Sequence, residues 1–274
     1  MSSTSVSPNA SRMLQVSDFC PRFLILPSEM VLPKSLLRHF PAPAERLGTA
    51  SLYRSNESFD RENEPIENDL HGQEYVRIFE NFWLPSRVSD DTRKMLVRSL
   101  FSAIASNYDS IVTPEHNLHC YEHLHSLAKE LLHRTPDRLL DFGCGTGLIT
   151  HTKIGNEVSV LKGFDFCPKM ARLAREKGLD VIEGSIQAIE KEAYDLVLAS
   201  YVFHYGLTFD DWTTLLSCVA AHGAVLGNFH KGIGLDYAIK TLDSLKERCT
   251  YQVTESDFGP VLVVFVGPRG ISLC

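Results

Sequence analysis

The most constraining feature of this 274-residue chain is a glycine-rich run that directly follows an apolar pair. Two leucines precede Asp141, and glycines follow at every second position, at Gly143, Gly145 and Gly147. Glycine lacks a Cβ and tolerates positive φ, so the backbone of such a turn can approach a ligand closely. A helix that opens after the turn would point its unpaired N–H groups at the same ligand. The run therefore predicts a nucleotide-type site between a strand and a helix.

The spacing of these glycines separates two classes of nucleotide-binding protein. Nicotinamide-dependent oxidoreductases carry G-x-G-x-x-G in this turn, whereas residues 141–147 of this chain read D-x-G-x-G-x-G. In sites of this general architecture, an acidic residue about 20 positions past the glycines accepts hydrogen bonds from ribose hydroxyls. Asp165 ends the next apolar run at a comparable distance from Gly147. The pattern favours a nucleoside ligand and disfavours a nicotinamide-dependent oxidoreductase.

Strand and helix patterns alternate through the rest of the chain. We expect strands at 158–164, 179–183, 194–199, 224–229, 250–253 and 261–266, and helices at 168–177, 208–221 and 236–248. Pro168 and Gly178 mark the ends of one helix, and Thr208 with Asp211 has capping-box spacing, with Asp in place of the usual Glu. A turn cluster at 255–260 joins the last two strands as an antiparallel hairpin. The alternation indicates a parallel α/β sheet covered on both faces.

The D-x-G-x-G-x-G run resembles motif I of the class I S-adenosylmethionine (SAM) dependent methyltransferases. Residues 101–109, 165–170 and 199–205 are similar to further motifs of the ubiquinone/menaquinone-biosynthesis type of small-molecule methyltransferase, with Cys167 where Ser is usual. The resemblance covers about residues 105–270. It implies a Rossmann-like, seven-stranded, mostly parallel sheet with an antiparallel C-terminal hairpin. It also implies SAM as cofactor and S-adenosylhomocysteine (SAH) as product.

The resemblance also implies a set of cofactor-binding residues. Tyr108 would cover the methionine end of SAM. The third motif of the family usually reads Gly-Asp, its Asp binding the adenine amino group, whereas this chain has Gly184-Ser185, whose hydroxyl can still accept a hydrogen bond. The full expected set is Tyr108, Asp141, Gly143, Cys144, Gly145, Gly147, Asp165, Phe166, Met170, Ser185, Ile186 and Ser200.

The residues that follow the expected strand at 194–199 are the candidates for catalysis and acceptor binding. His204 lies on the carboxyl edge of the sheet, where open α/β sites form, and its ordinary pKa near 6.5 suits a general base. A structural histidine that orients the loop is the alternative. Tyr201, Phe203 and Tyr205 would line an acceptor pocket, although aromatic residues there could equally belong to the core.

Two further groups invite a chemical interpretation that we do not adopt. Cys144 has no His or Asp at a telling spacing, so we interpret it as a small residue filling tight space rather than as a nucleophile. His119 and His123 share a helix face, with further histidines nearby, as metal ligands can. Because no carboxylate-rich partner segment is evident, we expect no metal site.

The expected function is methyl transfer from SAM to an O, N or C atom of a small-molecule metabolite. The alternative is a protein of the same fold that transfers no methyl group, either a cyclase-type enzyme or a non-catalytic partner subunit. A net charge of −7 without basic clusters argues against a nucleic-acid partner. We expect no membrane span. Seven irregularly placed cysteines indicate reduced thiols and hence a cytoplasmic protein. The sequence leaves a homodimer open.

The first hundred residues give the weakest signals. Residues 1–12 are polar and predicted to be a disordered tail. Residues 13–104 are predicted to form an irregular or helical extension that folds over the cofactor cleft, because prolines are frequent there; packing away from the site is the alternative. An apolar stripe predicts a helix from Asp90 to about Ile104. Residues 105–274 would then form the SAM-binding domain.

Overall fold

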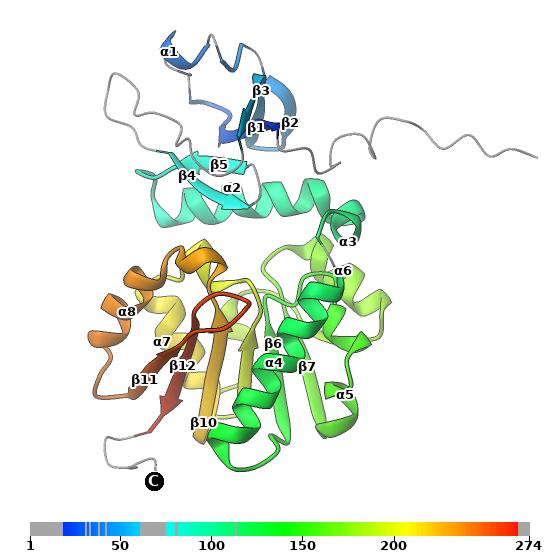
Figure 1. Cartoon of the computed structure of the whole chain (residues 1–274), viewed down its shortest axis with the longest axis vertical. Coiled ribbons are helices and arrows are strands. Elements are labelled where there is room, and N and C mark those ends of the chain that lie inside the picture. Colours follow the sequence, from blue (N-terminus) through cyan, green and yellow to red (C-terminus); the bar gives the residue numbers. More distant parts are fainter. Residues whose placement is uncertain are drawn as a thin grey trace, which may run out of the picture. The chain divides into compact units, whose positions relative to one another are not determined.

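The computed structural model describes residues 19–267 except 31, 33, 38, 42, 61–74, 80, 81 and 113. Two compact units make up the chain, residues 1–100 and residues 101–274 (Figure 1). The tail predicted at residues 1–12 lies outside the described residues.

The first unit contains a five-stranded sheet. Its strands are β1 (Phe19–Pro27), β2 (Pro43–Leu47), β3 (Ala50–Asp60), β4 (Tyr75–Phe79) and β5 (Phe82–Pro85), arranged in the order β2-β3-β1-β5-β4. β1 pairs with β5 in parallel, and the other neighbours are antiparallel. The short helix α1 (Lys34–Leu37) contributes Leu36 to a core that includes Leu24 and Phe40.

This sheet corrects the prediction of an irregular or helical extension. Prolines suggested that long regular elements were improbable, yet they occupy the positions that a sheet tolerates. Pro27 and Pro85 end their strands, Pro43 begins one, and Pro21 stands at a register shift in β1. Proline lacks the N–H that a ladder needs, and such ends and bulges do not require it. The charged sequence of residues 54–73 predicts turns, but residues 54–60 supply the end of β3, and the remainder from residue 61 lies outside the described residues.

The helix predicted from Asp90 is confirmed as α2 (Asp90–Ile104). The Ser89 hydroxyl accepts a hydrogen bond from the backbone N–H of Thr92, at 3.2 Å, which satisfies one unpaired donor of the first turn. Leu96 and Leu100 of its apolar stripe are fully buried.

The second unit has the predicted seven-stranded sheet, in the order β11-β12-β10-β9-β6-β7-β8. β6 to β10 are mutually parallel where they pair, and β12 is antiparallel to both β10 and β11. The predicted C-terminal hairpin is therefore confirmed. The strands are β6 (Arg138–Phe142), β7 (Val160–Phe164), β8 (Asp180–Ile182), β9 (Tyr194–Ala199), β10 (Val219–Asn228), β11 (Cys249–Thr254) and β12 (Val261–Val266).

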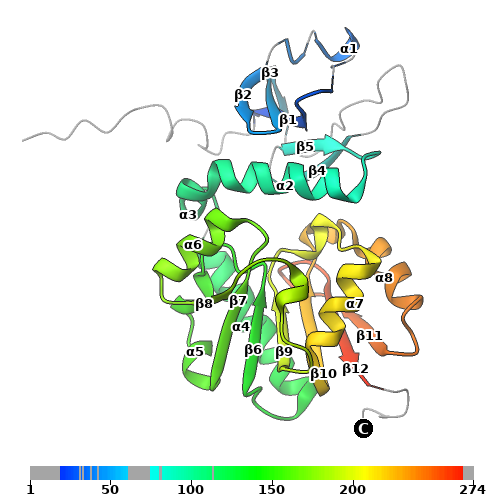
Figure 2. The ribbon, with the colours of Figure 1, turned by 180° about the vertical axis from the view of Figure 1, so that it is seen from behind.

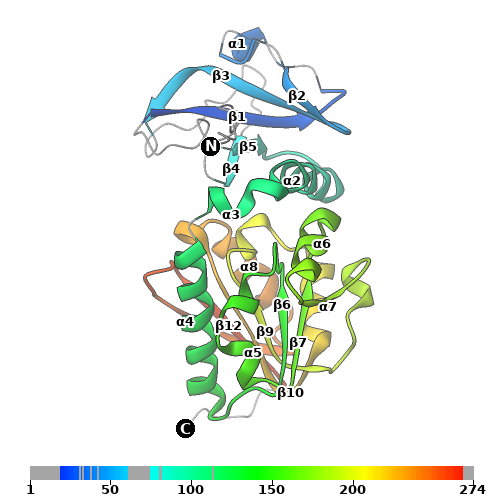
Figure 3. The same cartoon turned by 90° about the vertical axis from the view of Figure 1, so that its right-hand side faces the viewer.

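Helices cover both faces of this sheet. The principal ones are α4 (Pro114–Leu132), α6 (Pro168–Glu176), α7 (Phe209–Cys218) and α8 (Leu235–Asp243). Alternate residues of a strand point to opposite faces, and accordingly Leu139 packs with residues of α4 and α6, whereas Leu140 packs with residues of α7 and α8. Seen along the sheet, α4 lies on one side and α7 on the other (Figure 3), and α7 comes to the front when the molecule is viewed from behind (Figure 2).

Two helices end earlier than the sequence predicts. α7 ends at Cys218 rather than near Ala221, because Val219 already pairs with Tyr194 of β9 as the start of β10. α8 ends at Asp243, and a turn replaces its predicted last residues. The capping box that begins α7 is confirmed: the Thr208 hydroxyl accepts from the Asp211 backbone, and the Asp211 carboxylate accepts from the Thr208 backbone.

Candidate active site

The glycine loop follows β6 as the sequence predicts. Its three glycines have φ of 76°, 52° and 79°, all in the left-handed region. The backbone N–H groups of Gly143 and Cys144 donate to the carbonyl oxygen of Phe164, at 2.7 and 3.0 Å, which ties the loop to the end of β7. The element that follows is a four-residue 3-10 turn, Leu148–His151, and not the helix expected. The predicted α-helix N-terminus is therefore absent at this turn.

The three glycines of the loop differ in what surrounds their Cα atoms. A Cβ on Gly143 would lie 2.4 Å from Cγ2 of Val202, and one on Gly147 would lie 2.9 Å from the backbone Cα of Ala174. These two positions are filled by protein, so they need glycine for packing. A Cβ on Gly145 would meet only Cε1 of Tyr108, at 3.9 Å. The open space of this loop therefore lies at Gly145.

Asp165 faces the same place from the end of β7. One of its carboxylate oxygens accepts from the Gly145 backbone N–H at 2.9 Å, and the other accepts from the Cys167 N–H at 2.7 Å. Burial raises the pKa of Asp165 to about 6, while the two backbone hydrogen bonds hold it down. Each carboxylate oxygen has a second lone pair, so the group can still accept from a ligand hydroxyl.

Tyr108 covers this corner from the chain segment that precedes α4. It begins α3 (Tyr108–Ile111), after the 3-10 turn η1 (Ala105–Asn107). Burial, and secondarily the charges of Asp165 and Asp109, raise the pKa of its hydroxyl, which therefore stays protonated. Phe101 packs edge-on against Tyr108 and Tyr205, with ring centroids 6.0 and 5.2 Å apart.

Asp141 occupies a different environment from Asp165. Its side chain is fully buried, and the Tyr121 hydroxyl of α4 donates to both of its oxygens at 3.1 Å. Burial raises the pKa of Asp141 to about 8, with the hydrogen bond from Tyr121 opposing and the charge of Asp165 adding. The structure thus places the first acidic residue of the motif beneath the loop, against α4.

Other expected cofactor residues vary in accessibility. Cys144 is buried, its sulfur would lie 2.9 Å from a Cβ on Gly163, and burial raises the pKa of its thiol. Such a thiol is a packing group and no nucleophile. Ser185 is exposed at the end of β8, whereas the hydroxyl of Ser200 at the end of β9 is buried without a partner. Phe166 is partly buried, and Met170 and Ile186 are buried.

The segment after β9 holds the candidate acceptor-side residues. Tyr201 has a left-handed backbone, with φ of 56°, and the buried Asn228 side chain accepts its backbone N–H at 2.8 Å. Its hydroxyl lies 2.8 Å from Nε2 of His116. A bulky residue in this conformation is strained, and such strain concentrates at functional sites.

His204 lies beside Tyr205 and His230, with ring centroids 4.1 and 6.1 Å away. Burial, with His230 adding, lowers the pKa of His204 to about 3. Its Nδ1 is buried without a hydrogen-bond partner. Phe203 is buried and packs with Trp212 and Phe229, and its role at the acceptor stays a prediction.

The histidines of α4 separate in the structure. His116 contacts Tyr201, the ring of His123 lies 5.5 Å from that of Phe258 between centroids, and His125 lies buried near Glu157. No group of three or more potential metal ligands occurs among the described residues. Sequence reasoning missed Tyr121 and Asn228, which support the site through contacts 20 and 27 positions away along the chain. The only signal in the sequence is the residue type, because Tyr and Asn side chains form hydrogen bonds when they are buried.

Comparison with known proteins finds similarity to methyltransferases. Residues 139–227 match the family model of a methyltransferase domain. The chain is 29% identical over 113 residues to an uncharacterized methyltransferase of Bacillus pumilus, covering 39% of this chain and 53% of the relative. It is also 29% identical over 99 residues to trans-aconitate 2-methyltransferase of Mycobacterium ulcerans, covering 34% of this chain and 38% of the relative. The chain thus spans about half or less of the length of these curated relatives.

Two solved structures share the fold. A SAM-dependent methyltransferase of Methanococcus maripaludis, itself assigned by likeness, superposes with a TM-score of 0.52 at 14% identity, over 62% of this chain and 95% of that one. The plantazolicin methyltransferase BpumL in complex with SAH gives 0.51 at 15% identity, over 65% and 95%. Residues 139–227 thus match a methyltransferase domain, and residues 101–274 have the fold of SAM-dependent methyltransferases, as the sequence predicts. The narrower similarity to the ubiquinone/menaquinone-biosynthesis type stays a prediction.

Proposed function

We propose that this protein binds SAM and transfers its methyl group to a small molecule. The observation that carries the proposal is the open corner formed by Gly145, Asp165 and Tyr108. A glycine with positive φ, whose only close side chain is Tyr108, a carboxylate and that half-buried aromatic ring meet there. These residues fit a nucleoside with a charged side chain: the carboxylate for ribose hydroxyls, the open backbone for close approach, and the ring for the methionine end.

The protein's part in the reaction is mainly positioning. SAM supplies an electrophilic methyl group, and the chain has to hold the acceptor atom in line with it, which can contribute several kcal/mol. Asp165 and the glycine loop fix one end of the cofactor, and Tyr108 excludes water from the other. We assign the acceptor side to Tyr201 and Tyr205. Trans-aconitate 2-methyltransferase acts on a small molecule, which supports a small-molecule acceptor here; the acceptor atom, O, N or C, is set by the substrate.

His204 is the group that we assign to remove a proton from the acceptor. Because its pKa is lowered to about 3, its ring is neutral at physiological pH and free to accept. The same low pKa makes it a weak base. It therefore suits an acceptor whose proton is already acidic, and its contribution should fall at the low end of the range for general base catalysis.

Titration calorimetry with SAH on the full chain tests the binding step. We expect micromolar affinity, and no heat of binding at millimolar SAH would overturn the proposal. Methyl transfer is tested by incubating the protein with isotopically labelled SAM and cell extract, followed by a mass search for products heavier by one methyl group. Binding of SAM without turnover to SAH across a broad set of acceptors would instead favour the cyclase-type or non-catalytic alternative.

Further expectations remain part of this proposal. We propose that the protein works in the cytoplasm on a small-molecule substrate without nucleic acid, and that it can form a homodimer. Five cysteines of the second unit, Cys120, Cys144, Cys167, Cys218 and Cys249, are free thiols, which supports a reducing compartment. Across the described residues, no helix is long and apolar enough to cross a bilayer.

A further inference from the structure

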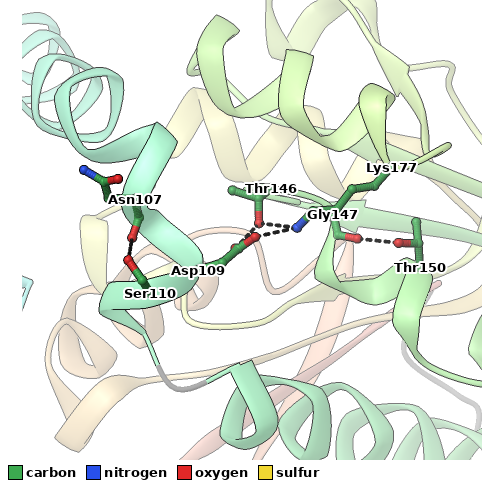
Figure 4. A network of polar contacts seen from close by, with 7 residues as sticks. All are labelled: Asn107, Asp109, Ser110, Thr146, Gly147, Thr150 and Lys177. Carbon is green, nitrogen blue, oxygen red and sulfur yellow. Dashed lines mark hydrogen bonds and ion pairs between the residues drawn. The ribbon is translucent and has the colours of Figure 1, made fainter. Parts of the chain in front are cut away.

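Three side chains from separate elements form a closed polar triangle beside the glycine loop (Figure 4). The Thr146 hydroxyl donates to Oδ1 of Asp109 at 2.5 Å, and the Lys177 ammonium donates to Oδ2 of Asp109 at 2.6 Å. The same ammonium donates to Thr146 Oγ1 at 3.2 Å. Asp109 comes from α3, Thr146 from the glycine loop and Lys177 from the end of α6. The triangle therefore links α3, the glycine loop and the end of α6 to one another.

The triangle is more than an isolated surface ion pair. The Asp109 and Lys177 side chains are 39% and 26% exposed, and an ion pair at that exposure alone contributes about 0–1 kcal/mol. Thr146, however, is only 2% exposed, and its hydroxyl both donates and accepts within the triangle. A buried hydroxyl that loses its partners is destabilised by about 1–3 kcal/mol. The three groups consequently depend on one another.

The chain segment that contains Asp109 would not keep its conformation without contacts to the rest of the protein. We call residues 101–112 the strap. Its helix α3 has four residues, far fewer than an isolated helix needs for stability. At its other end, the Ser102 hydroxyl lies 3.2 Å from the sulfur of Cys167, and the Lys169 ammonium donates to the Ser102 carbonyl oxygen at 2.9 Å. Between these anchors lies Tyr108, the neighbour of Asp109.

We propose that Asp109, Thr146 and Lys177 form a latch that positions Tyr108 over Gly145 and thereby sets the affinity for the nucleoside ligand. Lys177 and Asp109 are positioning residues, since they act through Tyr108 and the loop. Without the latch, the strap is open for a larger fraction of the time, and while it is open Tyr108 does not cover the ligand. This inference rests on the proposed function, because it concerns the same ligand site.

The chain offers a matched control. Lys129 of α4 forms an ion pair with Glu157 at 2.8 Å, with side chains 34% and 39% exposed. That pair has nearly the geometry and exposure of Lys177 with Asp109, and it bonds to neither the strap nor the glycine loop. Lys177→Met and Lys129→Met therefore remove equivalent charges, and only the first removes the latch.

The experiment compares these two variants of the full chain by SAH calorimetry and by hydrogen exchange. Lys177→Met should weaken SAH binding about three- to tenfold and speed exchange in residues 101–112, whereas Lys129→Met should stay within about twofold of wild type. Lys177→Arg, which keeps a charged donor, should recover most of the affinity. If Lys177→Met folds poorly, Asp109→Asn serves as the second variant with the same expectation.

Two results would overturn the latch. One is SAH affinity and strap exchange in Lys177→Met that equal those of Lys129→Met; the other is weakened affinity with unchanged strap exchange, which would place Lys177 in direct contact with the ligand. Failure of the proposed function is a separate outcome: wild type would then bind no SAH. Exchange of residues 101–112 in the ligand-free variants still tests the latch in that case.

Discussion

The Tyr121 hydroxyl bridges both carboxylate oxygens of Asp141, at 3.1 Å each, in the interior between α4 and β6. Asp141 is the first acidic residue of the glycine motif, yet it is fully buried and its pKa is raised to about 8. At neutral pH the folded, ligand-free protein therefore holds this carboxyl largely protonated. The residue acts as a buried polar support for the loop, and its protonation is linked to stability.

Stability should fall as pH rises through the range set by Asp141. A raised pKa means that the folded state binds more protons than the unfolded state between about pH 4 and pH 8, so the free energy of unfolding decreases across that window. Asp141→Asn, which keeps a neutral side chain of similar shape, should flatten this slope. Urea unfolding at several pH values measures it, and equal slopes for wild type and variant would contradict the assignment.

Removing the hydroxyl of Tyr121 should act on the same linkage. The hydrogen bond from Tyr121 lowers the pKa of Asp141, so Tyr121→Phe should raise that pKa further and destabilise the fold by about 1–3 kcal/mol. Tyr251→Phe is the control, because that hydroxyl bonds Asp243 at an exposed position. The loss for Tyr121→Phe should grow with pH, and a pH-independent loss would argue against a link through Asp141.

Asp165 should make SAH binding depend on pH. Its pKa is raised to about 6 by burial, and only the ionised carboxylate offers both oxygens to ribose hydroxyls. We expect SAH affinity to be constant above about pH 7 and to fall as pH drops through 6. Asp165→Ala should weaken binding by about 1.5–3 kcal/mol, the range for hydrogen bonds to a charged group, and remove the pH dependence. A pH profile that persists in the variant would assign it to another group.

The sequence predicts most of the second unit because its signals are local. β9 and β12 coincide with the expected ranges 194–199 and 261–266, since predominantly apolar runs in a covered sheet leave little choice of boundary. The capping box of Thr208 and Asp211 is equally local. The glycine motif likewise predicts its own turn, with positive φ at all three glycines.

What the sequence could not predict depends on distant partners. Asp109 and Lys177 are 68 positions apart, and nothing in either stretch indicates that they meet. The five-stranded sheet of the first unit was missed because the meaning of a proline depends on which strand end it occupies. The sequence around Cys218 predicts a helix that continues, yet the next residue, Val219, pairs with Tyr194 of β9 and begins β10. The left-handed backbone of Tyr201 requires Asn228, which lies on another strand.

The glycine loop should separate ligand binding from folding. A Cβ on Gly147 meets the Ala174 backbone at 2.9 Å, so Gly147→Ala should lower the free energy of unfolding by several kcal/mol. Gly145→Ala meets only Tyr108 at 3.9 Å, so it should cost about 1–2 kcal/mol for its left-handed backbone and yet weaken SAH binding at least tenfold. Thermal unfolding and calorimetry measure the two effects. Normal SAH binding by Gly145→Ala would show that no ligand approaches there.

His204 gives the sharpest test of chemistry, because its lowered pKa changes the expected pH profile. A base with an ordinary pKa would produce a fall in kcat/KM below about pH 6–7. With the pKa lowered to about 3 by burial and His230, the ring stays neutral, and no such limb from His204 should appear between pH 5 and 8. The neutral ring is the active form of the base. Because it is already fully populated between pH 5 and 8, kcat/KM should not change in that range through His204.

His204→Gln should therefore reduce kcat about 10²-fold, at the low end for general base catalysis, at all pH values alike and with SAH affinity nearly unchanged. Steady-state rates from pH 5 to 8, with calorimetry on the same variant, provide the measurement. A limb near pH 6–7 that the variant lacks would mean that acceptor binding restores an ordinary pKa. A rate within about threefold of wild type would leave His204 as a structural residue beside Tyr205, with catalysis resting on positioning alone.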